Sequence, residues 1–575
     1  MSDHTLVPDP KPRFAPWLLE PMVENKHTYF KVAAAAVLIN VFALVTSLFS
    51  MVIYDRVIPN NAMSSLLALS IGFAVVIVFD FLLKMLRAYF VDIAGADIDH
   101  QVGDRVFRKL LAIRLDHKKG STGALAGLMR ELEALRDFFA SATMTALVDF
   151  PFLILTVAVI WAIGGKVVIV LLIIIPIVLL TAWATNPALE RLTAKTLREG
   201  LSKQSVLVET IGGLETVKAS GAGPMLTDRW LSAVRQQSDS SLRQRLISSI
   251  AITVAGSAST ISYAAVVIVG VNLIAARELT SGGLIACSLL AGRAIAPLAQ
   301  ISQLLARLSA TRTAYRQINA MMEQPSEGPA GEPLQIAALS GKIEFRNVTF
   351  RYPGGAEPAL QGISFTIEPG ERVALLGRVG SGKSTITRLI LGLYPPEDGL
   401  VMVDGTDLRQ IDPATLRAQI GVAMQDSVLM TGSVRENISL GRANVDDAEL
   451  LRASTLSGTH QFMGQIANGY DLKLADRGEG LSGGQRQSIA IARALAGKPP
   501  MLVFDEPSAS MDAQTEQGLI ERLQNEVQGR TMVLVTHRPP LLQLVQRIIV
   551  MERGRIAMDG PRDKVMQQLT RPKVA

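Results

Sequence analysis

The loop at residues 377–384, with the sequence GRVGSGKS, carries the residue types in this chain best suited to chemistry. An apolar run precedes it at 373–376, and a helix-compatible stretch follows at 385–391. A strand, a glycine loop and a helix in that order let backbone N–H groups and the helix N-terminus surround phosphate oxygens. Lys383 would reach the β- and γ-phosphates, and the Ser384 hydroxyl would ligate Mg²⁺. The sequence therefore predicts a nucleoside triphosphate site.

Two further segments would supply groups for cleaving such a phosphate. An apolar, strand-like run ends in Asp505 and Glu506. Asp505 is placed to hold Mg²⁺ through water, and Glu506 to polarise the water that attacks the γ-phosphate. A second apolar run, 531–536, delivers His537 at its C-terminal end, where ligands bind in an open α/β sheet. A single histidine there is more often structural, so its interpretation rests on the rest of the set.

Tyr352 ends an alternating, strand-like segment at 342–352 and precedes the glycine loop by about 25 residues. Its ring would stack on a purine base, or it would be an ordinary strand-end tyrosine of the core. The residues around it do not decide between these alternatives.

These residues need a soluble α/β domain to position them, and only the C-terminal part of the chain has that composition. The chain has 575 residues, with several long apolar runs at 32–301 and ordinary charge at 342–575. A Pro/Gly/Glu-rich stretch, EQPSEGPAGEP, at 323–333 marks a boundary. The predicted organisation is an N-terminal tail at 1–31, a transmembrane domain at 32–322, a linker at 323–341 and a nucleotide-binding domain at 342–575.

Six apolar runs in the first half are each close to the length needed to cross a bilayer. A single run of this kind could be a buried helix of a soluble protein, but six together favour a membrane domain. The predicted spans are 32–54, 64–83, 145–163, 167–184, 250–275 and 283–301.

The placement of lysine and arginine predicts the orientation. The connection 84–144 holds ten of them and 185–249 holds nine, whereas the links 55–63, 164–166 and 276–282 hold one each. Both long connections, both termini and the nucleotide-binding domain are therefore predicted to be cytoplasmic. This asymmetry also accounts for the pI of about 9.3 without a nucleic-acid partner.

The long connections are predicted to continue the spans as helices, at 97–115 and 189–217, with turns near 116–123 and 220–224. Asp80, Lys84 and Arg87 would share one helical face, either as paired or solvated charges or as part of a substrate path. Cys287, the single cysteine, excludes an intramolecular disulfide and is expected to be a packed thiol. Residues 1–29 are polar and proline-rich, so no cleavable signal peptide is expected.

The segment LSGGQ at 481–485 resembles the signature motif of ABC (ATP-binding cassette) proteins. The other elements follow in the family's order: Tyr352 resembles the A-loop tyrosine, Gln425 the Q-loop glutamine, residues 510–512 the D-loop and His537 the switch histidine. The resemblance implies an ATP hydrolase with Glu506 and His537 as catalytic residues. It implies Mg²⁺ held by Ser384, Gln425 and Asp505. The implied ATP-binding residues are Tyr352, Gly377, Arg378, Val379, Gly380, Ser381, Gly382, Lys383, Ser384, Thr385, Gln425, Ser482, Gly483, Gly484, Gln485 and Asp505.

Six spans ahead of one cassette resemble an ABC exporter half-transporter, an α-helical six-span domain fused to an α/β P-loop ATPase. In that family the signature motif completes the ATP site of the opposite cassette. The resemblance therefore implies a homodimer with two composite sites.

Segments 54–61 (YDRVIPNN), 149–152 (DFPF), 215–221 (ETVKASG) and 477–480 (RGEG) resemble the ABC components of type I protein secretion systems. This implies export of a polypeptide across the cell inner membrane, together with a periplasmic membrane-fusion adaptor and an outer-membrane channel. Two departures are an N-terminal peptidase-like domain, which is not expected here, and Asp476, where many exporters have a glutamate. The alternative is a lipid or drug exporter of the same architecture. Intact Glu506 and His537 disfavour a gated channel with little turnover, the six spans exclude a soluble ATPase, and the fused cassette disfavours an importer.

Overall fold

The computed structural model describes residues 15–117, 122–139, 149–329, 331–440, 442, 444–466 and 468–570. The chain forms two compact units. Unit 1 comprises Met1–Leu111 and Lys119–Gln324, and unit 2 comprises Ala112–Lys118 and Pro325–Ala575. Residues 112–118, which lie within the predicted transmembrane domain, are thus grouped with the C-terminal unit.

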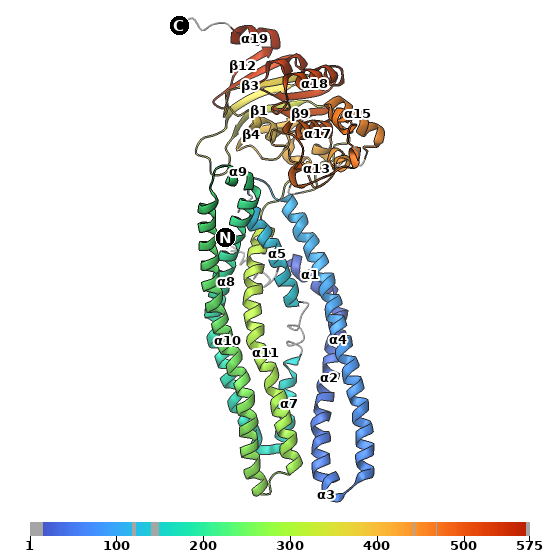
Figure 1. Cartoon of the computed structure of the whole chain (residues 1–575), viewed down its shortest axis with the longest axis vertical. Helices are drawn as coiled ribbons and strands as arrows, with labels where there is room; N and C mark the ends of the chain where they lie inside the picture. Colours follow the sequence, from blue (N-terminus) through green and yellow to red (C-terminus); the bar gives the residue numbers. More distant parts are fainter. Residues whose placement is uncertain are drawn as a thin grey trace, which may run out of the picture. The chain divides into compact units, whose positions relative to one another are not determined.

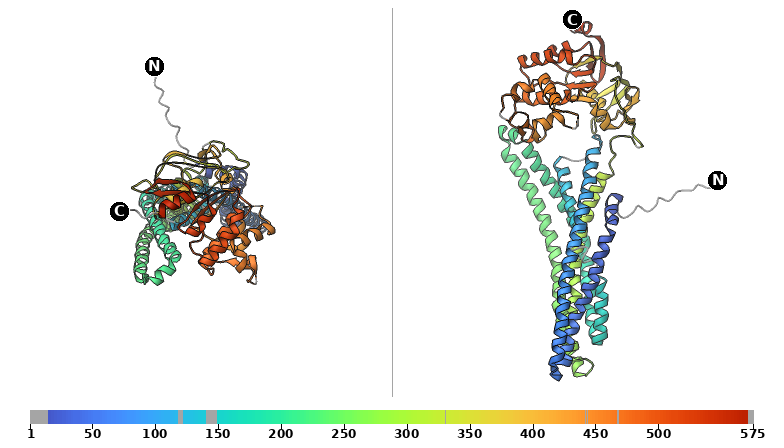
Figure 2. Two further views of the ribbon diagram at one scale, coloured as in Figure 1. Left: turned by 90° about the horizontal axis from the view of Figure 1, so that it is seen from above. Right: turned by 90° about the vertical axis from the view of Figure 1, so that its right-hand side faces the viewer.

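Unit 1 is helical throughout its described residues, and its long helices run alongside one another in Figures 1 and 2. Four helices continue unbroken well beyond the predicted spans, and two of them reach residues 112 and 212, within the helical connections predicted at 97–115 and 189–217. The elements are α1 (Pro16–Glu24), α2 (Lys26–Val52), the π-helical turn η1 (Ile53–Val57), α3 (Ile58–Asn60), α4 (Met63–Ala112), α5 (Thr122–Phe139), α7 (Phe152–Gly164), the 3₁₀ turn η2 (Gly165–Val167), α8 (Val168–Gly212), α9 (Leu214–Ala219), α10 (Gly223–Ala275) and α11 (Ser281–Met322).

Four helical runs of unit 1 are long and apolar enough to cross a membrane: Lys26–Asn60, Met63–Ala112, Phe152–Gly212 and Gly223–Ala275. A shorter apolar helix covers Ser281–Ile295. The third run contains the predicted spans three and four, which the turn η2 separates, and residues 140–148 of span three lie outside the described residues. A multi-pass helical domain is confirmed, and the count of six spans stays a prediction.

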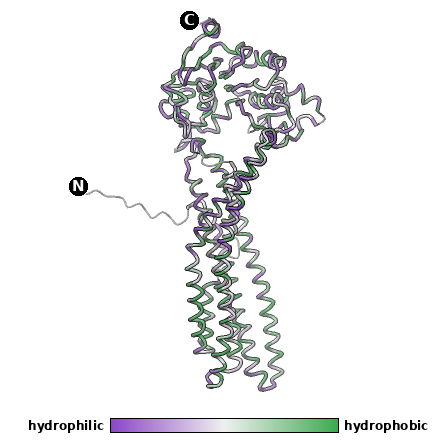
Figure 3. The backbone as a smooth tube through the Cα atoms, turned by 60° about the vertical axis from the view of Figure 1, so that its left-hand side comes forward, coloured by the Kyte–Doolittle hydropathy of each residue, from purple (hydrophilic) through white to green (hydrophobic). Residues whose placement is uncertain are grey.

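Apolar side chains of unit 1 face outward as well as inward, as a bilayer requires. None of the most apolar window of α4 is buried within the chain. Figure 3 shows hydrophobic residues concentrated in the half of the unit that holds the turn between α2 and α4. The inward-facing residues of α7, α8, α10 and α11 form one core that includes Ile160, Leu171 and Leu290. Cys287 is fully buried in that core as a free thiol, which confirms its prediction.

The charged face of α4 consists of paired groups. Lys84 Nζ lies 2.6 Å from Asp80 Oδ2. Arg87 Nη1 donates to both carboxylate oxygens of Asp149 at 3.2 Å, and Asn40 Nδ2 donates to the same carboxylate at 3.0 Å. Lys84 and Arg87 are therefore paired with carboxylates, as one of the two predicted alternatives requires, and a role in a substrate path stays a prediction.

The turns between the long helices fall where the sequence places them. The chain turns at 220–222, between α9 and α10, as predicted for 220–224. It also turns at 115–117, where the predicted turn 116–123 begins, and residues 118–121 of that predicted turn lie outside the described residues.

Unit 2 is built on a six-stranded sheet with the strand order β12-β11-β3-β10-β9-β6. The pairs that join β11, β3, β10, β9 and β6 are parallel, and β12 is antiparallel to β11. Every residue of β9 (Met501–Asp505) and β10 (Thr531–Val535) is buried, because helices cover both faces of a parallel sheet. This explains why their sequences are continuous apolar runs rather than alternating ones.

A second sheet, with the order β2-β1-β4-β5, is antiparallel, and Tyr352 follows its strand β1 in the chain. The remaining elements of unit 2 lie around these two sheets (Figure 1). The strands are β1 (Ile343–Phe350), β2 (Leu360–Ile367), β3 (Arg372–Gly377), β4 (Asp398–Val403), β5 (Thr406–Asp407), β6 (Ile420–Ala423), β7 (Gly432–Ser433), β8 (Lys473–Leu474), β11 (Arg547–Glu552) and β12 (Arg555–Pro561). The helices are α12 (Lys383–Ile390), η3 (Leu408–Gln410), α13 (Pro413–Ala418), α14 (Val434–Ser439), α15 (Asp447–Ser457), α16 (Thr459–Met463), η4 (Gly469–Asp471), η5 (Asp476–Gly478), α17 (Gly483–Leu495), α18 (Ala513–Glu526), η6 (Pro539–Leu544) and α19 (Arg562–Thr570).

Gly421 of β6 tests the packing of α17 on the sheet. A Cβ at this position would lie 2.0 Å from the carbonyl oxygen of Ala494 and 2.8 Å from side-chain atoms of Leu502 and Pro499. Gly421→Ala should therefore destabilise unit 2 by about 1–3 kcal/mol through overpacking, lowering the midpoint of its thermal unfolding. Gly331→Ala is the matched control, since a Cβ there has no atom within 4 Å among the described residues. Equal unfolding midpoints for both variants would contradict this packing.

Candidate functional site

Four adjacent parallel strands bring the predicted site residues to one edge of the main sheet. β3 leads into the glycine loop, β10 into His537, β9 into Asp505 and Glu506, and β6 toward Gln425. In the register, Val535 of β10 pairs with Asp505 of β9 on one side and Leu375 of β3 on the other. The carboxyl ends of parallel strands meet at one edge, so residues up to about 160 positions apart in sequence become neighbours.

The glycines of the loop permit a backbone path that other residues would block. Gly377 has φ 148°, and a Cβ there would lie 2.2 Å from the carbonyl oxygen of Met551. Gly382 has φ 100°, and its Cβ would lie 2.7 Å from the carbonyl oxygen of Ala359. Both therefore have to be glycine. The loop then enters α12 at Lys383, which leaves the helix N-terminus open to an anion.

The ammonium of Lys383 lies inside this loop. Its Nζ donates to the carbonyl oxygens of Gly377 at 2.8 Å and Arg378 at 3.0 Å. Burial lowers the pKa of Lys383, while the nearby carboxylates of Glu506 and Asp505 act in the opposite direction. The positive charge is therefore held at the centre of the loop, where phosphate oxygens would sit.

The other residues of the loop divide into buried and exposed ones. Val379 at its tip is 93% exposed, whereas Ser381 is buried and its hydroxyl has no hydrogen-bond partner within the described structure. Thr385, which directly follows Ser384 in α12, is buried, and its hydroxyl lies 3.2 Å from the hydroxyl of Tyr352. The buried members are thus those that face the helix and the sheet.

Asp505 and Glu506 are adjacent carboxylates in a largely buried position. Asp505 is 1% exposed, and the side chain of Glu506 is 13% exposed. Burial raises the pKa of Asp505, and it is opposed by hydrogen bonding from Ser384 and by the charge of Arg388. Asp505 Oδ1 and Glu506 Oε1 have no hydrogen-bond partner within the described structure. Buried acceptors of this kind are costly unless a ligand completes their bonding.

Glu506 has a strained backbone, with φ 50° in the left-handed region. Its N–H donates to the carbonyl oxygen of Val535 at 2.9 Å. The Nε2 atom of His537 lies 3.7 Å from Glu506 Oε1, and the backbone N–H of His537 donates to Oε2 at 3.4 Å. Non-glycine residues in this conformation are concentrated at functional sites. The Glu506 carboxylate thus lies beside the histidine in a backbone conformation that is typical of functional sites.

Tyr352 contacts the helix that follows the glycine loop. Its hydroxyl accepts a 2.7 Å hydrogen bond from Arg388, and the Arg388 guanidinium lies 5.7 Å from the ring centroid. Its ring makes edge contacts with Phe350 and Tyr394. The structure therefore gives the tyrosine core contacts on one side while leaving it partly exposed.

The signature segment caps its own helix. Ser482 is the N-cap of α17, its hydroxyl accepts from the N–H of Gln485, and its own N–H donates to Gln485 Oε1 at 2.8 Å. Gly483 and Gly484 begin the helix and pack against the D-loop residue Ser510. Among the described residues no hydrogen bond joins segment 481–485 to the glycine loop of the same chain. Gln425, two residues beyond β6, is exposed.

Two residues of the site were not predicted from the sequence. Gln487 donates from Nε2 to the carbonyl oxygen of Glu506 at 2.7 Å and accepts from the N–H of Ser510 at 2.9 Å. Arg538 donates at 3.0 Å to the carbonyl oxygens of both Met511 and Ala509. They connect the signature helix and the histidine turn to the D-loop. The sequence places Gln487 just after the signature segment and Arg538 just after His537, which was the only local sign of a role. Their contacts depend on the strand order, which the sequence does not show.

The site fits a nucleoside triphosphate with a hard cation. A lysine within a glycine loop at a helix N-terminus suits phosphate, and buried carboxylate and hydroxyl oxygens suit Mg²⁺. Ser384 and Asp505 are the candidate ligands that the structure brings together, since hydrogen bonding from Ser384 lowers the pKa of Asp505. Elsewhere in the described residues, no group of three or more His, Cys, Asp or Glu side chains forms a metal site.

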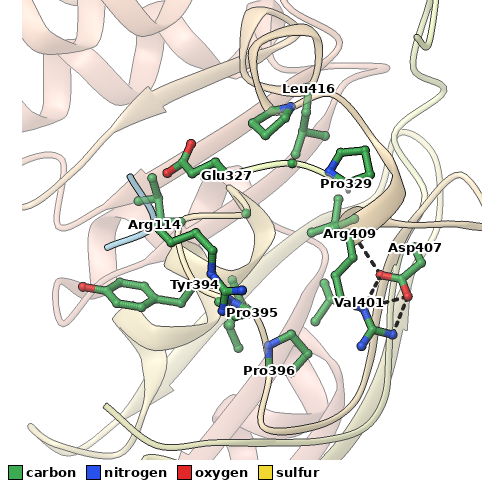
Figure 4. Close-up of a pocket in the computed structure, with 16 residues that line it drawn as sticks. Arg114, Glu327, Pro329, Tyr394, Pro395, Pro396, Val401, Asp407, Arg409 and Leu416 are labelled. Atoms are coloured by element: carbon green, nitrogen blue, oxygen red, sulfur yellow. Dashed lines mark hydrogen bonds and ion pairs between the residues drawn. The ribbon is translucent and has the colours of Figure 1, made fainter. Parts of the chain in front are cut away.

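A second cavity in unit 2, of about 290 Å³, is shown in Figure 4. It is lined by leucines, prolines, Tyr394 and the charged residues Arg114, Glu327, Asp407 and Arg409. The charged groups are neutralised by partners, as in the Arg409–Asp407 pair at 2.6 Å. None of the predicted site residues lines it, so it is distinct from the phosphate loop.

Comparison with known proteins gives the family of both units. Residues 29–298 match the model of the ABC transporter transmembrane region, and residues 360–509 match that of the ABC transporter ATP-binding domain. The leukotoxin translocation ATP-binding protein LktB of Pasteurella haemolytica-like sp. (strain 5943B) is 33% identical over 96% of this chain and 78% of its own length. This chain belongs to the ABC transporter family.

Other relatives support the same assignment. The LktB proteins of Mannheimia glucosida and Bibersteinia trehalosi are each 32% identical over 96% of this chain and 78% of their own length. The structure of a bacterial Atm1-family ABC exporter with ATP bound has the same fold, with a TM-score of 0.83, 24% identity and coverage of 96% of this chain and 97% of that one. As an ABC transporter, the protein is a multi-pass membrane protein that binds and hydrolyses ATP.

Substitution of Glu506 tests its role in ATP hydrolysis by this ABC transporter. Glu506→Gln keeps the size of the side chain but removes the base, and we expect ATP turnover to fall by about 10²- to 10⁴-fold while ATP binding persists. Phosphate release and binding of a fluorescent ATP analogue measure the two effects separately. Lys383→Ala is the comparison variant and should lose ATP binding itself. Turnover by Glu506→Gln close to that of the wild type would contradict the assignment.

Proposed function

We propose that this chain is the ATP-driven component that exports a polypeptide across the inner membrane in a type I secretion system. The observation that carries the proposal is the similarity to leukotoxin translocation ATP-binding proteins, which extends over 96% of the chain and so includes both units. The segments YDRVIPNN and DFPF of the membrane unit support it independently of the cassette. A cassette alone would not distinguish one transported substrate from another.

In the proposed mechanism the glycine loop and Lys383 bind the phosphates of ATP, and Tyr352 stacks on its base. Ser384, Gln425 and Asp505 hold Mg²⁺, which neutralises charge on the phosphate oxygens. Glu506 polarises the attacking water, and His537 holds that carboxylate and the γ-phosphate in position. The 3.7 Å separation between His537 Nε2 and Glu506 Oε1 supports these two roles.

The proposal includes a homodimer with two shared sites. Ser482, Gly483 and Gly484 stand at the N-terminus of α17, which favours an anion, yet they form no hydrogen bond with the glycine loop of their own chain within the described residues. A second copy would present this terminus to that loop. The capping box engages the N–H groups of Ser482 and Gln485 and does not engage those of Gly483 and Gly484.

The proposed location is the inner membrane, with both termini and the cassette in the cytoplasm. The asymmetry of lysine and arginine supports this orientation. The links predicted to face outward are short, at 55–63, 164–166 and 276–282. Turns of that size would not cross a periplasm, so the proposal requires a periplasmic adaptor and an outer-membrane channel as partners, and a secreted protein as substrate.

A lipid or drug exporter is the second candidate. Exporters of several substrates share this fold, and the site residues described above act on ATP in all of them.

Mixed dimers test the shared sites. Chains with Lys383→Ala combined with chains with Ser482→Arg would form heterodimers in which one site carries both changes and the other carries none. We expect ATPase activity to recover partly in the mixture, while each variant alone stays inactive. The absence of recovery in heterodimers verified by two affinity tags would contradict shared sites.

Co-purification tests the secretion proposal. The dimer extracted from native membranes is expected to retain a periplasmic adaptor that has its own membrane helix. Its ATPase rate should respond to the C-terminal segment of the secreted protein and remain unchanged with a scrambled segment of the same composition. Recovery without an adaptor, together with stimulation by lipids or small amphiphiles alone, would favour the second candidate.

A further inference from the structure

The segment YDRVIPNN forms the turn between α2 and α4, and the ATPase does not explain its residues. Figure 1 shows these two helices as the arms of a hairpin that meet at α3. The turn contains the π-helical segment Ile53–Val57. Single π-turns inside helices are rare and occur frequently at functional sites.

Asp55 in this π-turn is fully engaged with α11. Its carboxylate accepts from the hydroxyl of Thr280 at 2.7 Å and from the N–H of Gly282 at 2.8 Å. Gly282 allows this approach, because a Cβ there would lie 2.4 Å from the carbonyl oxygen of Met51. Asp55 therefore caps α11 and fixes the rotation of the turn.

With Asp55 directed at α11, the next residue, Arg56, is directed elsewhere, since successive residues of a helix do not share a face. Arg56 lines a cavity of about 860 Å³ between α2 and α4. The structure gives the guanidinium of Arg56 no ion pair within the described residues. Asn60, which also lines the cavity, donates to the backbone oxygen of Arg56 at 2.9 Å rather than neutralising it.

The interior of the cavity is apolar away from this end. Its walls include Val45, Leu48 and Val52 from α2, and Leu69 and Val76 from α4. It thus has an unpaired cation at the end where the chain turns, and aliphatic side chains along its length. Its volume lies in the range typical of small-molecule sites, about 300–1,000 Å³.

The width of the cavity limits what can enter. Phe49 of α2 and Phe73 of α4 stack across it with their ring centroids 4.3 Å apart. This ring pair joins the two helices, so another helix, with a diameter of about 10–12 Å, does not fit between them. The residues that line the cavity on either side of the ring pair are mostly apolar, which favours an extended hydrocarbon chain as the occupant.

We propose that the α2–α4 groove binds one acyl chain of a membrane phospholipid, with the lipid phosphate on Arg56. The adjacent residues Asp55 and Arg56 of the π-turn then have separate roles, since Asp55 caps α11 and Arg56 binds the headgroup. In the orientation given under the proposed function, this is a lipid of the outer leaflet of the inner membrane. The site itself depends only on the geometry of unit 1 and not on the transported substrate.

Native mass spectrometry of the full-length protein, titrated with palmitoyl-oleoyl-phosphatidylglycerol in detergent, measures this binding. The wild type should retain one lipid per chain. Arg56→Gln should weaken its binding by about tenfold, the loss expected for a charge-assisted hydrogen bond, and Arg56→Lys should restore part of it. Arg277→Gln is the charge-matched control, from the exposed turn between α10 and α11, and should bind lipid as the wild type does.

A second variant closes the groove without touching the charge. Gly72 lines the cavity, and a Cβ there meets no atom within 4 Å among the described residues, so Gly72→Leu should fill the groove without a clash. This variant should lose the bound lipid. Gly256→Leu in α10 is the control, because a Cβ there also has open space and the residue does not line the groove. ATPase activity equal to the wild type confirms the fold of each variant.

Equal lipid retention by Arg56→Gln, Gly72→Leu and their controls would overturn the proposal. Loss of a co-purifying protein rather than a lipid from Gly72→Leu would also overturn it, since the occupant would then be a partner. Lipid retention by the Arg56 and Gly72 variants does not test protein export. Protein export without the bound lipid would contradict only the lipid proposal, and a bound lipid without protein export would contradict only the secretion proposal.

Discussion

Two adjacent carboxylates buried at the end of one strand are the constraint on which the cassette depends. Asp505 and Glu506 lie in a largely buried position where a charged oxygen without partners is costly, and each has one oxygen with no hydrogen-bond partner within the described structure. The charges of Lys383 and Arg388 offset part of this cost at Asp505. A cation with a triphosphate would supply the remaining interactions. The cassette is therefore organised around charges that a nucleotide would complete.

The strand order and the backbone at Glu506 hold these carboxylates in place. β10 lies between β3 and β9, so the histidine that follows it faces the glutamate that follows β9. The left-handed conformation of Glu506 costs on the order of 1–3 kcal/mol, and the bonds from its N–H to Val535 and from Gln487 to its carbonyl oxygen resist its relaxation. Gln487 and Arg538 extend this support to the D-loop. Any movement of the D-loop would thus act directly on the backbone of Glu506.

Much of the site could be predicted from the sequence because its chemistry is encoded locally. The spacing of glycines, lysine and serine in 377–384 specifies a phosphate loop wherever it follows a strand, and the apolar runs before Asp505 and His537 specify buried parallel strands. The contacts of Gln487 and Arg538 could not be predicted, since they depend on which strands are neighbours. For the same reason the pairing of Arg87 with Asp149 could not be predicted, because the two residues lie 62 positions apart in sequence.

The membrane unit follows a different physical rule, in which apolar side chains cover both the core and the outer surface. This pattern predicts helices and their continuation into long connections, but not their pairing, because lipid-facing and helix-facing residues are equally apolar. Among the described residues of this unit, the individually specified positions are polar ones, such as Asp55 on α11 and Asp149 with Arg87.

We infer that the unsatisfied oxygen of Asp505 is reserved for the cation that accompanies ATP. Calorimetric titration of the purified protein with a non-hydrolysable ATP analogue, with and without Mg²⁺, tests this most directly in the wild type and in Asp505→Asn. Mg²⁺ is expected to strengthen nucleotide binding to the wild type and to have little effect on Asp505→Asn. An undiminished effect of Mg²⁺ on Asp505→Asn would contradict it.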